Sequence, residues 1–149
     1  MWQKLLSSAL DVLPRYIHEI NKNTGDKNSG GYFCVFTNDN LISPLGVLKI
    51  GEPPQEKQLK YFLLTQEKAQ RLLSNPDHDS SWESRDVDIN KFGGAIRTPD
   101  YVLSFSGLPE INDETLMIMF AFRLGMIPTS QVEKIIQFSG NQLVMSLLD

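Results

Sequence analysis

Three acidic residues stand close together in the second half of the chain: Glu110, Asp113 and Glu114. Carboxyl groups at such spacing can supply a general acid and a general base for proton transfer. They also stand at the start of a predicted helix, where negative charge is stabilised by the positive end of the helix dipole. The sequence leaves both roles open, and we favour a protein without catalytic activity because no substrate is indicated.

Other residues that often carry catalysis lack their usual patterns. Ser104, Ser106 and Ser139 invite a hydrolase interpretation, but no Gly-x-Ser-x-Gly elbow is present. The pair Gly93-Gly94 is not part of a Gly-x-Gly-x-x-Gly or Lys-Ser/Thr signature, so no phosphate-binding loop is predicted. Adjacent glycines instead allow close approach of the backbone by a ligand or by a packed helix.

No metal site is predicted from the histidines. His18 and His78 are the only two, and they lie far apart in a helix and in an acidic segment. His78 together with Asp77, Asp79 and Asp88 has the ligand types for a divalent cation, and one imidazole is enough for an axial haem ligand. A histidine on the solvated surface explains each position equally simply, so these alternatives stay open.

Composition and charge exclude several classes of protein. The chain has 149 residues, 41% of them hydrophobic and 21% charged, with a formal net charge of -4. These values are typical of one ordinary globular domain, and we predict a single domain over residues 1–149. Lys57, Lys60, Lys68 and Arg71 share a predicted helix face, which usually means a solvated surface, so no nucleic-acid partner is expected.

The cysteine content and the N-terminal sequence favour a cytoplasmic protein. Cys34 is the only cysteine, so no intramolecular disulfide can form, and its strand-like surroundings predict a buried, inert thiol. The first residues lack the pattern of a secretory signal. The longest apolar stretch, residues 116–124, is too short to span a bilayer, and no membrane association is expected.

The first third of the chain predicts a helix followed by a hairpin. Apolar residues recur at steps of three and four over residues 2–20, which indicates an amphipathic helix. Pro14 should kink or divide it, because proline removes one backbone donor. Two strand-like runs, 32–36 and 45–50, flank the turn-forming residues 38–40 and predict an antiparallel hairpin.

The middle of the chain predicts a second helix and then an exposed segment. Residues 58–75 carry a helical apolar pattern, which is clearest after Thr65, a candidate N-cap. A short strand over residues 60–64 is an alternative. Residues 75–90 are rich in aspartate and poor in apolar residues, so we expect an exposed, mobile acidic loop at about 75–90.

The last third predicts a second hairpin and two helices. Strand-like runs at 92–97 and 101–106 are separated by a Thr-Pro-Asp turn. Asn112 can cap a following helix that is apolar nearly all round, which indicates a central helix or one in a subunit interface. Ser130 and Glu133 have the spacing of a capping box for one last helix.

The order of these motifs resembles the GlcG/HbpS-like haem-degrading family, which includes the C-terminal domain of the PduO adenosyltransferase. The residues that carry the resemblance are Phe92-Gly-Gly-Ala-Ile-Arg97, Tyr101-Val-Leu-Ser-Phe-Ser-Gly-Leu-Pro-Glu110 and Asp113-Glu114 before the apolar helix. The upstream step Gln66-Glu-Lys-Ala69 agrees as well, and the resemblance spans about residues 5–124.

The resemblance implies an α+β fold, with an antiparallel β-sheet flanked by helices in a profilin- or roadblock-like arrangement. It also implies a tendency to form homo-oligomers and, in some members, binding of haem or corrinoid. No other cofactor is expected. This chain differs from the family by its acidic segment, by its extra C-terminal helix and by the absence of a ligand histidine from the matched motifs.

Two hypotheses for function follow. The first is a non-enzymatic small-molecule-binding or sensory domain, with haem or corrinoid as candidate ligands, whose pocket is lined by Gly93, Gly94, Ser106, Gly107 and Glu110. The alternative is a protein-interaction module that forms homo- or hetero-oligomers through its apolar helices. In that case residues 116–124 and the N-terminal helix would bury against a second copy or another protein.

Overall fold

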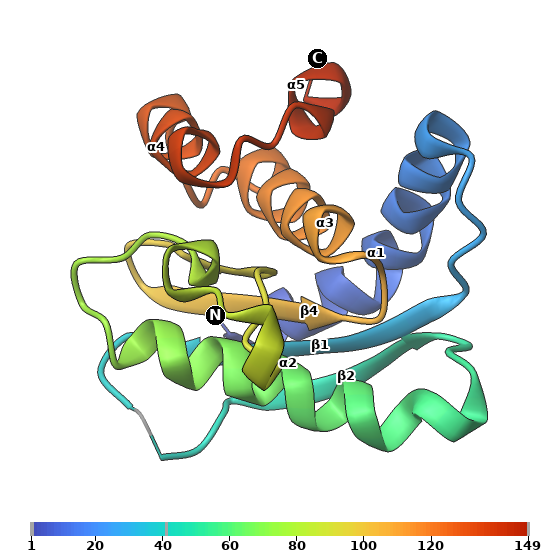
Figure 1. Cartoon of the computed structure of the whole chain (residues 1–149), viewed down its shortest axis with the longest axis horizontal. Helices are drawn as coiled ribbons and strands as arrows, with labels where there is room; N and C mark the ends of the chain where they lie inside the picture. The colour runs from blue at the N-terminus through green and yellow to red at the C-terminus, as the bar shows by residue number, and fades with distance from the viewer. Residues whose placement is uncertain (1, 41, 149) are drawn as a thin grey trace.

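The computed structural model describes residues 2–40 and 42–148 and shows an α+β fold, as expected (Figure 1). The main elements, in chain order, are α1 (Trp2–Thr24), β1 (Gly30–Thr37), β2 (Gly46–Gly51), α2 (Gln58–Leu73), β3 (Ala95–Arg97), β4 (Tyr101–Ser106), α3 (Glu110–Arg123), α4 (Thr129–Ser139) and α5 (Leu143–Leu147). Short 3-10 helices lie at Gln55–Lys57, Ser81–Ser84 and Val87–Ile89. Within the described residues, no helix combines the length and apolar character needed to cross a membrane.

The strands form a four-stranded antiparallel sheet in the order β2-β1-β4-β3. Both predicted hairpins are therefore confirmed, and β1 and β4 lie at the centre. Cys34 on β1 lies opposite Val47 on β2 and opposite Ser104 on β4, which fixes the register of the three strands. The thiol of Cys34 is buried and free, and desolvation raises its pKa to about 12, in agreement with the inert role predicted for it.

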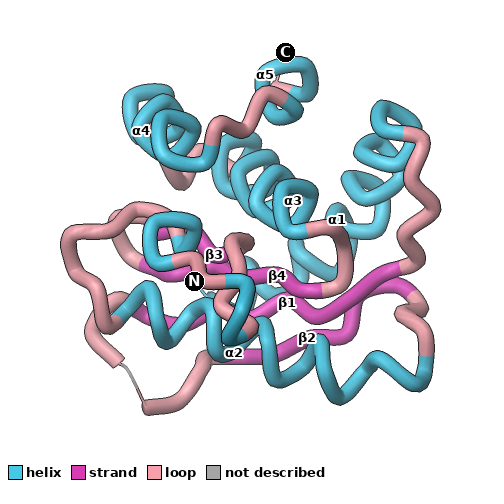
Figure 2. Tube along the Cα trace, in the orientation of Figure 1, coloured by secondary structure: helices cyan, strands magenta, loops and turns pink. Residues whose placement is uncertain are grey.

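Helices cover both faces of this sheet. Figure 2 shows α2 along one face and α1 and α3 along the other, with α4 and α5 outside α3. Alternate residues of β4 point to opposite faces of the sheet. Leu103 and Phe105 belong to the core shared with α1 and α3. Val102 packs with Leu72 and Leu73 of α2.

The apolar helix predicted from the sequence is α3, and it is central within the chain itself. All its residues from Leu116 to Ala121 are buried, and the ring of Phe120 meets that of Phe33 edge to face, with centroids 5.5 Å apart. Helices α1, α4 and α5 of the same chain pack against it. The sequence hypothesis of an interaction module placed residues 116–124 in a contact with a second copy or another protein. Most of these residues are instead covered by helices of the same chain.

Two details of the first helices differ from expectation. Helix α1 is not divided at Pro14, because this proline lies on its exposed side, where water can replace the missing donor. Helix α2 begins at Gln58, so the alternative of a strand over residues 60–64 is wrong. Thr65 is not an N-cap but a buried residue inside α2, and its hydroxyl bonds to the hydroxyl of Ser104 across the sheet face.

The beginning of α3 also differs from the prediction. The helix begins at Glu110 after Pro109, so Asn112 is not its cap. The amide of Asn112 instead donates to Asp26 across 2.9 Å and connects α3 to the segment after α1. A proline before the helix leaves no side-chain cap there, and the acidic residues of the first turn are consequently inside the helix.

The C-terminal helix is divided rather than continuous. Gly140 adopts a left-handed conformation (φ 66°), ends α4 and separates it from α5. The capping box predicted from Ser130 and Glu133 is wrong, because α4 follows Pro128 and has no side-chain cap. A glycine that permits a positive φ thus overrides an apolar pattern that continues beyond it.

Residues 75–90 are more structured than the predicted exposed loop. The segment contains two short 3-10 helices, and Ser80 and Ser81 are buried. Arg71 of α2 donates to the backbone carbonyl groups of Ser81 and Phe92, which fixes the segment against the helix. Since Lys68 and Arg71 are buried, α2 does not present the four basic residues on one solvated face.

Candidate functional site

A cavity of about 180 Å³ lies between α2 and the connection from β4 to α3, and we call it the α2–α3 pocket. Helix α2 contributes one side, with Lys60, Tyr61, Leu64 and Lys68 at helical spacing. The strand end, the connection and the first turn of α3 contribute the other side, namely Ser106, Gly107, Leu108, Glu110 and Asp113, and Phe92 completes the wall. Its lining is thus drawn from three segments that are distant in sequence.

A buried ion pair forms the inner wall of this pocket. The ammonium group of Lys68 donates to a carboxylate oxygen of Asp113 across 2.9 Å and to the backbone carbonyl of Phe105 across 2.8 Å. Each side chain of the pair is only 2% exposed. The pair therefore joins α2, β4 and α3 at one point. Both side chains also line the cavity.

The surroundings of Asp113 hold its carboxyl group in a fixed orientation. Its second oxygen accepts from the backbone N–H of Leu108 across 2.9 Å. Burial raises the pKa of Asp113 to about 7, against the opposing effects of the Lys68 ammonium and the Leu108 N–H. Asp113 can consequently change its protonation state near neutral pH, unlike an exposed aspartate.

Gly94 lets the pair pack this closely. A Cβ atom at Gly94 would lie 2.7 Å from Nζ of Lys68 and 2.9 Å from Cβ of Asp113. The residue also has a φ of 125°, which side chains of L-amino acids rarely adopt. From the sequence, Gly94 could allow close approach either by a ligand or by a packed helix. In the structure it makes room for the side chains of Lys68 on α2 and Asp113 on α3.

Glu110, in the same turn of α3, is also engaged by the protein. Its carboxylate accepts two hydrogen bonds from the guanidinium of Arg85, at 2.5 and 3.1 Å, and one from the N–H of Gly93 at 3.2 Å. The guanidinium also lies over the ring of Trp82, 4.7 Å from its centroid. Gly93 is needed here because an added Cβ would collide with that ring.

The five residues predicted to line a pocket lie together at this place. Ser106, Gly107 and Glu110 line the cavity, whereas Gly93 and Gly94 lie behind its wall, where they support Glu110 and the ion pair. Sequence reasoning missed Lys68 as a buried residue. The available signal was its position on the apolar face of α2, three residues after Thr65 and four before Leu72.

Asp113 was noticed but was explained by the helix dipole. Its neighbour Glu114 is also fully buried, and its carboxylate accepts from the hydroxyl of Ser80 across 2.6 Å and from the amide of Asn141 across 3.0 Å. Burial raises the pKa of Glu114, against the hydrogen bonds of Ser80, Ser139 and Asn141. This second carboxyl group does not line the α2–α3 pocket and connects α3 to its neighbours.

The residues suggested for a metal do not form a metal site. The residues described by the structure contain no group of three or more histidine, cysteine or acidic side chains arranged to hold an ion. Asp79 accepts from the N–H of Arg97 through its backbone and pairs with Lys134 at 3.6 Å. His78 is half-buried, and its backbone carbonyl accepts from the side chain of Arg97.

The pocket does not have the dimensions for an enclosed tetrapyrrole. Pockets that enclose drug-sized ligands typically hold about 300–1,000 Å³, and the α2–α3 pocket holds about 180 Å³. Neither histidine lines it, although Tyr61 does. In this conformation, haem or corrinoid would therefore be held by an edge or a side group rather than within the fold.

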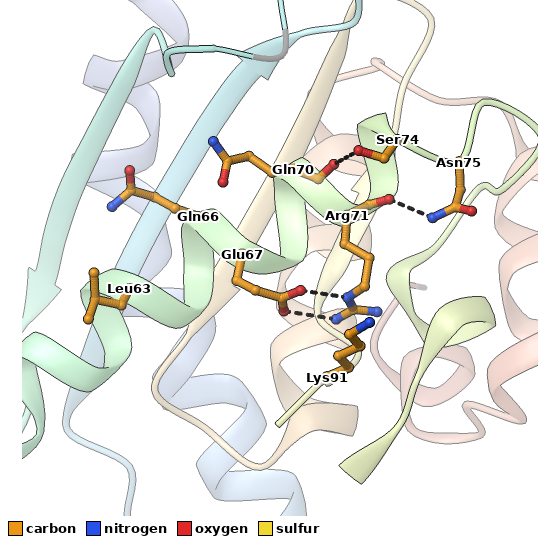
Figure 3. A pocket seen from close by; sticks show the side chains of 8 residues that line it. All are labelled: Leu63, Gln66, Glu67, Gln70, Arg71, Ser74, Asn75 and Lys91. Carbon is orange, nitrogen blue, oxygen red and sulfur yellow. Dashed lines mark hydrogen bonds and ion pairs between the residues drawn. The ribbon is translucent and has the colours of Figure 1, made fainter. Parts of the chain in front are cut away.

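A second, wider hollow of about 560 Å³ lies beside α2 and is drawn in Figure 3. Glu67 and Arg71 face one another on one side of it, and Lys91 lies beside them. Arg71 is already bound by Glu67, by Ser84 and by two backbone carbonyl groups. The guanidinium of Arg71 is therefore already engaged by the protein, although it lines this hollow.

Comparisons with family models, with curated proteins and with solved structures give no significant match for this chain. The geometry of the pocket is accordingly the main support for a function. Among its features, the buried ion pair is the least expected from the rest of the core, which is largely apolar around it.

Replacing Gly94 by alanine should destabilise the protein strongly, because the new methyl group meets the ion pair and φ is unfavourable. We expect a loss of about 2–4 kcal/mol in the free energy of unfolding. Gly125→Ala is the matched control, since Gly125 also has a positive φ but has no atom within 4 Å of an added Cβ, and it should cost about 1–2 kcal/mol. Urea denaturation of both variants measures the difference, and equal losses would contradict the close packing around Gly94.

Replacing Asp113 by asparagine should change the pH dependence of stability. A raised pKa in the folded state means that Asp113 binds its proton more tightly in the fold than in the unfolded chain. This contribution to stability is complete below the ordinary value of 3.8 and is lost as the pH rises through about 7. Wild type should therefore lose stability relative to Asp113→Asn between pH 4 and pH 8.

Denaturant unfolding of both proteins across that range measures this difference, in which the contributions of other titrating groups largely cancel. A difference that is constant, or that changes in favour of wild type as the pH rises, would contradict the raised pKa of Asp113.

Proposed function

We propose that this chain is a non-enzymatic domain that binds a small molecule in the α2–α3 pocket. The observation that carries the proposal is the placement of the Lys68–Asp113 pair on the wall of a cavity. A buried ion pair often stabilises a fold no more than apolar side chains of the same size would. Its presence beside a cavity is therefore better explained by a ligand that contacts it than by stability alone.

The structure around the pair supports the same proposal. Gly94, the Leu108 N–H and the Phe105 carbonyl hold the two charged groups in one geometry. A binding site benefits from such fixed polar groups because a ligand then meets partners that need no reordering. Apolar side chains such as Leu64 and Phe92 line the same cavity and can cover a ligand's carbon skeleton.

The volume favours a ligand smaller than a tetrapyrrole. Haem or corrinoid binding nevertheless stays part of the proposal, as a version in which the macrocycle lies outside and only a side group enters. We treat the two versions as separate outcomes of one experiment.

The test is a titration of the full chain with a library of small polar fragments, with haemin and with cobalamin, followed by NMR and by absorption. Binding at the pocket should perturb the amide signals of Ser106, Gly107 and Leu108. The variant Leu64→Trp places a bulkier side chain in the pocket. It should weaken the affinity for a ligand there by about tenfold or more, equivalent to about 1.4 kcal/mol.

Leu63→Trp is the matched control, because the neighbouring Leu63 is on α2 but lines the other hollow. It should change affinity by less than about twofold. If no fragment perturbs the pocket signals, or if both variants act alike, the proposed site is wrong. If only haemin and cobalamin give no response, the tetrapyrrole version alone is removed.

A protein-interaction module is a second proposal, supported by a different surface from the one first named for it. Most of α3 is buried, but α2 has an exposed apolar surface, where Leu59 is 70% exposed and Leu63 56% exposed, on the same helix as Phe62. If this surface binds a second copy, light scattering at micromolar concentration should give more than the monomer mass of 16.9 kDa. The double substitution Leu59→Asp and Leu63→Asp should then restore the monomer. A strict monomer in wild type contradicts self-association.

A further inference from the structure

Some polar groups of the α2–α3 pocket already have hydrogen-bond or ion-pair partners within the protein, and others do not. Its acceptors are engaged: both oxygens of Asp113 and both oxygens of Glu110 accept hydrogen bonds from the protein. Their charges are balanced as well, because Asp113 pairs with Lys68 and Glu110 pairs with Arg85. A cationic ligand would thus meet carboxylates that already have cationic partners.

The donors of the same pocket are only partly used. An ammonium group has three N–H donors, and the described partners of Lys68 take two of them. Lys60, Tyr61 and Ser106 also line the pocket, and within residues 2–40 and 42–148 their side chains have no hydrogen-bond or ion-pair partner. The ammonium groups of Lys60 and Lys68 can only donate, whereas the hydroxyl groups of Tyr61 and Ser106 can donate or accept. The unused capacity of the pocket therefore favours an acceptor on the ligand, and Lys60 contributes a positive charge that no described side chain balances.

From this asymmetry we propose that the α2–α3 pocket binds a small carboxylate through Lys60, Tyr61 and Lys68, and that binding is accompanied by uptake of one proton on Asp113. The proposal rests on the proposed function, since it names the ligand class of the same pocket. It also specifies the part of the ligand that is recognised: an anionic head with an apolar body short enough to lie against Leu64 and Phe92.

The proton uptake follows from the charges that face Asp113. Lys68 of α2 favours the ionised carboxylate, whereas Glu110 on its own helix disfavours it. A bound carboxylate adds a second negative charge beside Lys68, so the ionised form of Asp113 becomes less favourable and the neutral form more so. Once Asp113 is neutral, the positive charge of Lys68 is available to the ligand. The raised pKa of Asp113 places this change in a range that experiments reach easily.

The other titratable groups near Asp113 leave this coupling intact. Lys60 and Tyr61 line the pocket from α2, and the Arg85 guanidinium faces Glu110 and pairs with its carboxylate. Strand β4 contributes the Phe105 carbonyl and the Ser106 hydroxyl. Neither His18 nor His78 lines the pocket.

Three probes of nearly equal shape test the charge preference: benzoate, benzamide and benzamidine, which are anionic, neutral and cationic. NMR titration of the full chain at pH 6 should show benzoate binding about tenfold or more tightly than the other two. If benzamide or benzamidine binds in the pocket as tightly as benzoate, the anion preference is wrong, while the small-molecule function stands. If benzoate does not perturb the pocket signals, this inference also fails, and the fragment library then decides the function separately.

The pH dependence tests the proton. Between pH 6 and pH 8, the Kd of benzoate should rise towards a limit of about tenfold per pH unit, because one proton is taken up with the ligand. Asp113→Asn should remove most of that dependence. Since this variant can also alter stability, the same titration of wild type in two buffers by calorimetry provides a direct count of protons taken up. A count of zero overturns the coupling.

Lys60 provides a test that does not disturb the core, because its side chain is exposed. Lys60→Gln should weaken the affinity for benzoate by about threefold to tenfold and leave the affinity for benzamide unchanged. Lys57→Gln is the matched control, since Lys57 is also exposed near the start of α2 but does not line the pocket. Equal effects of the two substitutions would show only a general attraction to positive charge and would overturn the assignment of Lys60.

Discussion

The Lys68–Asp113 ion pair is the contact on which the arrangement of this protein depends. Lys68 belongs to α2 on one face of the sheet, and Asp113 belongs to α3 on the other. Their ammonium and carboxylate groups meet at the end of β4, where Lys68 also binds the carbonyl of Phe105. The two helical layers are thus connected directly by charge, in addition to their separate packing on the sheet.

This connection is possible because β3 is short. Strand β3 begins at Ala95, opposite Ser104 of β4. The carbonyl of Gly94 still accepts from the N–H of Phe105, and the pairing of the two strands ends there. The carbonyl of Phe105 then becomes available to Lys68, and Gly94 occupies the space with no side chain. Removing two charges from water is unfavourable, and the extra hydrogen bonds from Leu108 and to Phe105 reduce that penalty. The same gap in the sheet leaves the cavity beside the pair.

Much of the fold could be predicted from the sequence, because its signals are local. The strand-like runs and the turns between them predicted both hairpins, and the uniformly apolar residues of α3 predicted a helix that is either central or in a subunit interface. Two of the errors are at places where a distant contact decides. Asn112 looked like a cap but binds Asp26, and Thr65 looked like a cap but bonds to Ser104. No local pattern distinguishes those outcomes.

The candidate site shows the same limit more sharply. Its glycines, Ser106 and Glu110 were located from a sequence resemblance, and they do lie together. The partner of Asp113 could not be found in this way, because Lys68 lies far away in the sequence and the pairing depends on the sheet order. A lysine on the apolar face of a helix is a local conflict, and such conflicts often mark places where tertiary contacts or function override the pattern.

The segment 75–92 explains why the overall negative charge of the chain says little about the pocket. Two of its acidic residues have local partners: Glu83 accepts from the backbone N–H groups of Asp79 and Ser80, and Asp79 pairs with Lys134. The segment also supplies Arg85, which balances Glu110 at the pocket. Asp113 and Glu110 at the pocket are each paired with a cation. The potential inside the cavity is therefore set by the few groups that line it, and among these the ammonium of Lys60, which has no ion-pair partner in the described part of the chain, determines the sign.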